Sequence, residues 1–199
     1  DYYAGSRAPR GGLPSRVRRL GLDVVEALLH TQCDAVVTLN RQAKERLVRW
    51  GVPSRKVTVA GLWKPDAYFA GDREAYKGVL LERGVLTADQ VGHLRGRIVI
   101  SFLGLFYRGT HLRELLEAAK DYPDDLAVIL AGRGHDLPVV RDYAARFGNV
   151  LFLGWRSDDE LRELGRVTDI MYQPLDPREN VNWRYFGSTN KTFEAIAAG

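Results

Sequence analysis

The hydrophobic pattern from residue 97 onward alternates between short apolar runs and amphipathic segments. The apolar runs have the length and continuity of buried strands, and they lie at 97–104, 126–132, 149–154 and 168–174. Segments whose apolar positions recur with helical spacing separate them, at 110–120, 136–148 and 157–165. Strands that are apolar throughout and alternate with helices predict an α/β fold, with a Rossmann-like, doubly wound parallel sheet covered on both faces.

The first third of the chain repeats this pattern in a shorter form. It predicts a helix, a strand, a helix and a strand, at 12–31, 34–39, 40–51 and 56–61. We interpret residues 1–61 as the βαβ remnant of a second Rossmann-like domain. Residues 62–96 combine an aromatic connector with two helical pieces, at 72–84 and 88–95, and we interpret them as an interdomain linker. The main domain then occupies residues 97–199.

Two predicted helices begin with the spacing of a capping box, in which a Ser or Thr side chain and an acidic or amide side chain three residues later satisfy each other's backbone N–H groups. The pairs are Thr87 with Gln90, and Ser157 with Glu160. These pairs predict where the two helices start.

Composition places the chain among globular proteins. Of its 199 residues, 45% are hydrophobic and 27% are charged, and no apolar run is long enough to span a bilayer. The single cysteine, Cys33, excludes an internal disulfide and points to a reducing, cytoplasmic compartment. We expect Cys33 to be a small buried hydrophobe. The chain opens on Asp1 rather than on Met, so we expect a piece of a longer protein or a processed one.

The net charge is +4, and much of the basic excess lies early, at Arg7, Arg10, Arg16, Arg18 and Arg19. An apolar stripe runs between these charges, which favours the solvated face of a helix. A peripheral contact with an anionic membrane, at its inner face, is the second interpretation. No nucleic-acid-binding motif or aromatic interleaving accompanies the cluster, so we expect no nucleic-acid partner.

Ligands of doubly wound sheets bind outside the carboxyl ends of the strands, so the residues after each strand are informative. Three predicted strands end in glycine, at Gly104, Gly132 and Gly154, where backbone can approach a ligand closely or make an ordinary turn. Two of these glycines are followed by Arg133 and Arg156, and the arginine fork suits phosphate oxygens. This edge therefore indicates a site for an anionic ligand. Turns with solvated charges are the alternative.

A long loop at 174–189 follows the last predicted strand and leads to a helix whose candidate N-cap is Asn190. A helix N-terminus favours phosphate, which would explain why Lys191 stands in the first turn against the helix dipole. Glu194, one turn later, can accept two hydroxyl hydrogen bonds, as a ribose diol offers. The alternative is a surface ion pair between Lys191 and Glu194 on an ordinary amphipathic helix.

No competing chemistry is evident. The four histidines lack metal-ligand spacing and there is no Asp-x-Asp motif, so we expect neither a metal nor a cofactor. P-loop, dinucleotide-binding and nucleophile motifs are also missing from the sequence. His135, in the GRGHD segment, is the one histidine at the predicted ligand-binding edge.

Five blocks of sequence, in order, resemble the GT-B glycosyltransferases, specifically the large retaining family that includes bacterial cell-wall and capsule enzymes. The blocks are FLGLFYRGTHLRELLEAA, VILAGRGHD, NVLFLGWRSDDEL, TDIMYQPLDP and STNKTFEAIAAG. The upstream passage from Cys33 to Phe69 looks like the end of that family's acceptor-side domain and its linker. The resemblance implies transfer of a sugar from a nucleoside-diphosphate-sugar donor to a sugar, lipid-linked or other small acceptor. It also implies a role in cell-surface polysaccharide or glycoconjugate synthesis.

The resemblance also implies roles for individual residues. Arg108 and Lys191 would stabilise the departing diphosphate, and Glu194 would bind the ribose. The remaining donor-binding residues would lie near the phosphates or border the base, and they are Gly104, Gly109, Arg133, Gly134, Trp155, Arg156 and Asn190. In two places the chain departs from the family pattern. Leu105 stands where an arginine is common, and Phe186 stands where many members have a second glutamate, a role that Glu179 in the preceding loop would have to take.

Two further functions fit the same pattern. A GT-B-like sugar-nucleotide epimerase would share the fold and the donor site. A non-catalytic module would bind the nucleotide sugar without any chemistry.

Overall fold

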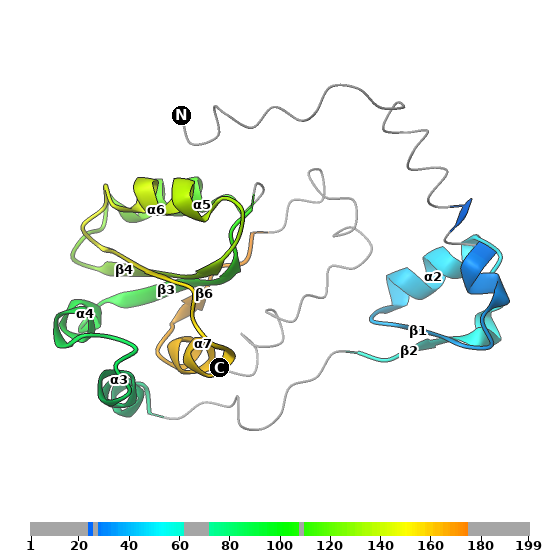
Figure 1. The fold of residues 1–199 in the computed structure, drawn as a ribbon, viewed down its shortest axis with the longest axis horizontal. Coiled ribbons are helices and arrows are strands. Elements are labelled where there is room, and N and C mark those ends of the chain that lie inside the picture. Colours follow the sequence, from blue (N-terminus) through cyan, green and yellow to red (C-terminus); the bar gives the residue numbers. More distant parts are fainter. Residues whose placement is uncertain (1–23, 26–27, 62–71, 108–109, 175–199) are drawn as a thin grey trace. The chain divides into compact units, whose positions relative to one another are not determined.

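The computed structural model describes residues 24–25, 28–61, 72–107 and 110–174. The chain divides into two compact units, with residues 24–61 in the smaller unit and residues 72–174 in the larger one. The larger unit contains the sheet that was predicted from the alternating pattern (Figure 1).

The larger unit is built on a four-stranded sheet in the order β5-β4-β3-β6, and every neighbouring pair is parallel. The strands are β3 (Ile98–Leu105), β4 (Leu126–Arg133), β5 (Val150–Gly154) and β6 (Ile170–Met171). The central pair is the most buried part, because both faces of β3 and β4 are covered and their apolar residues are nearly continuous. The predicted Rossmann-like α/β fold is confirmed.

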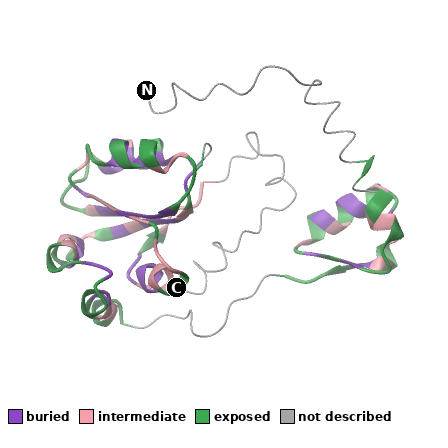
Figure 2. Cartoon of the chain, viewed as in Figure 1, coloured by how far each residue is buried: buried purple, intermediate pink, exposed green. Residues whose placement is uncertain are grey.

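Helices cover both faces of this sheet (Figure 1). On one face, α5 (Leu112–Ala119) and α6 (Leu137–Ala144) pack on Phe102, Val128 and Leu130. On the other face lie α3 (Arg73–Glu82), α4 (Ala88–Leu94) and α7 (Asp158–Arg166). Figure 2 shows the result as buried strands between helices whose outer sides are exposed. Both predicted capping boxes are present, at the starts of α4 and α7.

Helices α3 and α4 lie in the segment that we interpreted as an interdomain linker, yet their apolar side chains belong to the core of the larger unit. Leu80 and Leu94 are fully buried, and they form one cluster with Val99 and Ile129 of the sheet. An ion pair between Arg83 and Glu163 also joins the end of α3 to α7. Residues 72–96 therefore help to cover the sheet, while the other predicted domain limits stay predictions.

Strand β6 is shorter than the predicted run at 168–174, and its register with β3 covers Ile170 and Met171. Backbone hydrogen bonds to β3 nevertheless flank it on both sides, from the Asp169 N–H to the Val99 carbonyl and from the Tyr172 N–H to the Ser101 carbonyl, each at 2.8 Å. The Thr168 hydroxyl instead donates to the Leu164 carbonyl at 2.7 Å, which holds residue 168 against the end of α7.

The smaller unit is a βαβ piece in which β1 (Val36–Thr38) and β2 (Val57–Val59) pair in parallel. Helix α2 (Arg41–Arg49) connects the two strands, followed by a short 3-10 turn, η1 (Ser54–Lys56). Asn40 caps α2 by accepting the Ala43 N–H at 2.8 Å. The predicted strand–helix–strand order is thus observed within these limits. Of the predicted first helix, only residues 24–25 and 28–32 are described, and they are helical.

The expectation for Cys33 is wrong, because its thiol is exposed rather than buried. Cys33 follows the last helical residue at a turn, and its thiol donates to the Leu29 carbonyl at 3.4 Å. A cysteine at the end of a helix faces solvent unless another element covers it, and among the described residues none does so.

Candidate functional site

The carboxyl ends of β3, β4 and β5 meet at one edge of the sheet, because these strands are parallel and adjacent (Figure 1). Gly104 pairs with Gly132 in the β3–β4 register, and Gly154 ends β5 beside Ala131. A cavity of about 380 Å³ opens at this edge, and its volume falls in the range of small-molecule sites. The site is thus where the topology of such sheets places a ligand.

Four of the residues predicted from the sequence line this cavity, namely Gly104, Arg133, Trp155 and Arg156. They come from the ends of three different strands, so the fold brings together residues that are up to 52 positions apart, from 104 to 156. Gly134 and His135 are exposed in the turn after β4, and they are not among the residues that line the cavity. The roles given to the four lining residues stay predictions.

Close backbone contacts require the two glycines at the end of β4, of which Gly132 lies within the strand and Gly134 just after it. A Cβ on Gly132 would lie 1.8 Å from the Gly104 carbonyl oxygen, and a Cβ on Gly134 would lie 2.1 Å from the Phe106 carbonyl oxygen. Both glycines also have positive φ, at +146° and +155°, which other residues rarely adopt. The loops after β3 and β4 therefore pass each other without room for a side chain. Gly134 has this packing role whatever it does toward a ligand.

The two arginines of the cavity differ in whether their guanidinium groups already bind other groups of the protein. The Arg156 guanidinium donates to the Trp155 carbonyl at 2.9 Å, and its Nε lies 3.9 Å from the Glu160 carboxylate. Arg133 is exposed, and its side chain has no hydrogen-bond or ion-pair partner within the part of the chain that the structure describes. Arg133 is therefore the cation of this cavity that is open to a ligand.

The indole of Trp155 is 60% exposed, which is unusual for so large an apolar side chain. Leu105, across the strand ends, is also exposed at 55% and lines the same cavity. Exposed apolar groups beside an available guanidinium fit a ligand that combines a planar apolar part with hydrogen-bonding or anionic groups.

The N-terminus of α7 forms another part of the cavity wall, through Ser157, Asp158 and Leu161. Ser157 accepts the Glu160 N–H, and the Glu160 carboxylate accepts the Ser157 N–H and hydroxyl, each at 2.7 Å. Hydrogen bonds from the Ser157 hydroxyl and N–H, with the nearby Arg156 charge, lower the pKa of Glu160. The first turn of α7 therefore carries carboxylates, which disfavour a phosphate at this wall and favour hydrogen-bond donors instead.

Sequence reasoning did not assign five of the lining residues to the site, and they are Leu105, Gly132, Ser157, Asp158 and Leu161. In the sequence, Gly132 stands out only as a strand-end glycine, Ser157 only as a helix cap and Leu105 only as a departure from the family pattern. The signal for Asp158 and Leu161 was the position of the Ser157 cap, because a helix whose N-cap lies three residues after a strand must place its first turn at the same edge.

Several predicted site residues lie outside the described residues, so their positions do not enter this site. They are Arg108, Gly109, Asn190, Lys191 and Glu194, together with Glu179 and Phe186 of the long loop.

Within the described ranges, no group of three or more His, Cys, Asp or Glu side chains is placed to hold a metal ion. In the same ranges, no helix has both the length and the apolar character needed to cross a membrane.

The fold and the edge cavity define a Rossmann-like α/β domain of the GT-B type. No family model matches the sequence, and no curated protein does. The comparison with solved structures finds HepE of Anabaena, which has the GT-B fold, in three crystal structures.

The structure of HepE in complex with UDP matches with a TM-score of 0.65 and 14% sequence identity, over 88% of this chain and 46% of the HepE chain. The complex with UDP-glucose matches with a TM-score of 0.63 at the same identity and coverage. The complex with UDP and glucose gives a TM-score of 0.56 over 75% of this chain and 40% of HepE. This chain thus spans less than half the length of the structures that it matches, and at such low identity the likeness establishes the fold.

Proposed function

We propose that this chain is the nucleotide-sugar-binding part of a glycosyltransferase, which moves a sugar from a nucleoside-diphosphate-sugar donor to an acceptor. The observation that carries the proposal is the cavity that Gly104, Arg133 and Trp155 form at the carboxyl edge of the parallel sheet. It offers close backbone approach, an available guanidinium and an exposed aromatic face. Diphosphate and nucleobase need these three features together.

In this proposal, different described residues bind different parts of the donor. Trp155 stacks on the nucleobase, with Arg133 and Arg156 bordering it. The backbone at Gly104 leaves space for the diphosphate.

The chemical step rests on residues outside the described ranges and is proposed from the sequence. Arg108, Lys191 and the helix that starts near Asn190 stabilise the negative charge that grows on the departing diphosphate. Glu194 binds the ribose hydroxyls. A nucleoside diphosphate leaves without protonation by an acid, and cationic side chains supply the charge that a metal would otherwise supply, so we propose a metal-independent reaction.

Two kinds of evidence support the proposal independently. The five sequence blocks follow the order of the GT-B donor domain, and the fold matches HepE, whose structures contain UDP and UDP-glucose. The acceptor, a role in polysaccharide synthesis and a cytoplasmic location stay predictions.

Isothermal titration of this chain with UDP, GDP and ADP tests the proposal. We expect saturable binding of at least one of them, and Arg133→Gln and Trp155→Ala should each weaken that binding. No binding of any of the three at millimolar concentration, by a chain that circular dichroism shows to be folded, would refute the proposal. Product analysis of the full-length protein with and without acceptor then separates a transferase from an epimerase and from a module that only binds.

A further inference from the structure

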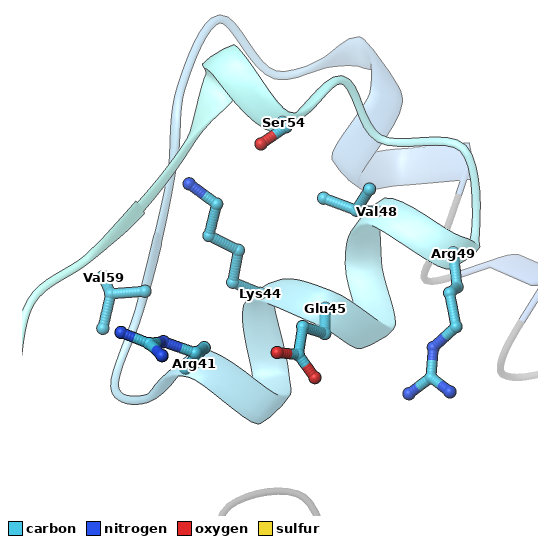
Figure 3. Close-up of a pocket in the computed structure, with 7 residues that line it drawn as sticks. All are labelled: Arg41, Lys44, Glu45, Val48, Arg49, Ser54 and Val59. Carbon is cyan, nitrogen blue, oxygen red and sulfur yellow. The ribbon is translucent and has the colours of Figure 1, made fainter.

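The smaller unit has a cavity of its own, with a volume of about 720 Å³, along the flank of α2 that faces η1 and β2 (Figure 3). Three cationic side chains line it, Arg41, Lys44 and Arg49, together with the hydroxyl of Ser54. Val48 and Val59 add an apolar part to the wall. All of these residues belong to one unit, so the cavity does not depend on how the two units are arranged.

Of the other Lys and Arg side chains that the structure describes in this unit, Lys56 and Arg46 already have structural partners. The Lys56 ammonium donates to the carbonyls of Thr31 and Cys33, at 3.2 and 2.9 Å, where it closes the helix that ends before Cys33. The Arg46 guanidinium lies 4.1 Å from the centre of the Trp50 ring, and Arg46 is buried. These two cations stabilise the fold and are not available to a ligand.

Arg41, Arg49 and Arg55 differ from them. All three are exposed, and none has an ion-pair or hydrogen-bond partner among the residues that the structure describes. Arg41 and Arg49 line the cavity of α2, whereas Arg55 does not. Two of these three unpaired guanidinium groups therefore lie at the cavity. Arg55 lies in the same unit but outside the cavity, so its substitution is a matched control for the loss of one positive charge.

Lys44 is held in place inside this cavity. Its ammonium donates to the Val57 carbonyl at 2.7 Å, which fixes the long side chain between α2 and β2 and leaves two of its three N–H donors unused. In Figure 3 the Lys44 side chain extends toward Ser54. Glu45, the only acidic residue among the described lining residues, points to the opposite side of α2 from Lys44 in the same view, and so does Arg49.

We propose that this cavity binds the phosphate of a small phosphate-bearing ligand or of a lipid headgroup. The lining carries three cations against one carboxylate, and two of the cations are guanidinium forks that match phosphate geometry. Lys44 supplies donors on an ammonium whose position is already set by Val57, and Ser54 adds an exposed hydroxyl. The two valines suit a ligand with an apolar body next to its phosphate. This site is separate from the donor cavity and does not rest on the proposed function.

Pyrophosphate is the probe, and the measurement is the change in amide chemical shifts of residues 41–59 when it is added to the full chain. We expect saturable shifts around Arg41, Lys44 and Ser54. Replacing both Arg41 and Arg49 by Gln should weaken this binding by about tenfold or more, since each charged hydrogen bond lost changes an affinity by roughly that factor. Arg55→Gln, and Arg133→Gln in the other cavity, should change the affinity at α2 by less than about twofold.

Vesicles separate the two sources of phosphate. Flotation with phosphatidylcholine vesicles, with and without phosphatidylglycerol, tests the lipid headgroup, and the double variant should lose any binding that depends on the anionic lipid. Binding of pyrophosphate alone assigns the site to a small ligand, and vesicle binding through Arg41 and Arg49 assigns it to a headgroup. The proposal is overturned if neither probe binds at α2, or if Arg55→Gln weakens binding as much as the double variant does.

Discussion

The amino ends and the carboxyl ends of the strands form two opposite edges of the four-stranded sheet. Both edges carry polar and charged side chains, but these side chains make different contacts. At the amino edge, polar side chains bind the backbone. Asn149 donates to the carbonyls of Ala119 and Leu126, at 2.8 and 3.2 Å, and Arg97 donates to the carbonyls of His93 and Asp124, at 2.6 and 3.2 Å. At the carboxyl edge, Arg133 and Trp155 are exposed beside a cavity.

This difference shows where the fold is held together and where it is open to a ligand. A polar group whose hydrogen bonds are satisfied inside the protein contributes to stability and has little left for a ligand. An exposed guanidinium and an exposed indole contribute little to stability, so their presence at one edge indicates binding. We therefore expect amino-edge substitutions to change the free energy of unfolding and carboxyl-edge substitutions to change affinity.

Gly132 is an exception to this expectation. It lies at the carboxyl edge, but its substitution should change stability, because the backbone contact that it makes is structural. In Gly132→Ala the new Cβ would lie 1.8 Å from the Gly104 carbonyl oxygen, with φ at +146°, so the two strand ends must separate. We expect the free energy of unfolding to fall by about 3 kcal/mol or more, measured by urea denaturation.

The matched control for this substitution is Gly92→Ala. Gly92 lies in α4, a Cβ at this position would have no atom within 4 Å, and its φ is not positive. Alanine there should raise stability by up to about 1 kcal/mol, because it favours the helix. If Gly132→Ala were as mild as Gly92→Ala, the close contact between the ends of β3 and β4 would be refuted.

Asn149→Ala tests the amino edge. Asn149 is 2% exposed, and its removal takes the side-chain donor from the Leu126 carbonyl and from the Ala119 carbonyl, which also accepts the Tyr122 N–H at 3.1 Å. We expect a loss of about 2 kcal/mol in the free energy of unfolding. Nucleotide affinity, measured by titration on the folded variant, should stay within about twofold of the wild type. A large loss of affinity without a loss of stability would contradict the division between the two edges.

Trp155→Ala tests the carboxyl edge in the opposite sense. With 60% of the side chain exposed, its loss should change the free energy of unfolding by no more than about 0.5 kcal/mol. Under the proposed function, nucleotide affinity should fall by about 1–2 kcal/mol, the scale of one base stacked on an aromatic ring. Trp155→Phe, which keeps a stacking face, should recover most of the affinity. An unchanged affinity in Trp155→Ala would remove this residue from the base site.

The sheet and its helices could be predicted because their signals are local. Apolar runs alternate with helical spacing, and the caps at Thr87 and Ser157 mark helix starts in the sequence itself. The packing of α3 and α4 could not be predicted in this way. Leu80 and Leu94 show an apolar face, but periodicity does not say which element covers that face. The exposure of Cys33 could not be predicted either. Cysteine is usually buried, but this one lies at the end of a helix, where no described element covers it.

The candidate site could be predicted in part for a similar reason. The rule that ligands bind at the carboxyl edge singled out Gly104, Arg133 and Arg156, since each stands at or just after the end of a recognisable strand, and the family resemblance added Trp155. Asp158 and Leu161 line the cavity because of the direction of the α7 axis relative to β5. That direction depends on the folded backbone and cannot be read from the sequence. The division between Arg156, which is partly engaged, and Arg133, which is open, also required the structure.

The smallest expected effect concerns Glu160, which lies beside the cavity but serves the cap of α7. Its pKa is lowered, first by the Ser157 hydroxyl and then by the Ser157 N–H and Arg156. A carboxylate with a lowered pKa in the folded state contributes stability above its unfolded pKa, near the ordinary value of 4.5, and loses it as the pH falls through the folded pKa. Glu160→Gln lacks this charge and keeps a hydrogen-bond acceptor. We therefore expect the variant to be less stable by no more than about 1 kcal/mol at neutral pH, because solvent screens the Glu160 charge, with the gap closing as the pH falls below the ordinary value of 4.5 in urea denaturation. A gap that stayed constant with pH would mean that the Glu160 charge contributes nothing to the cap.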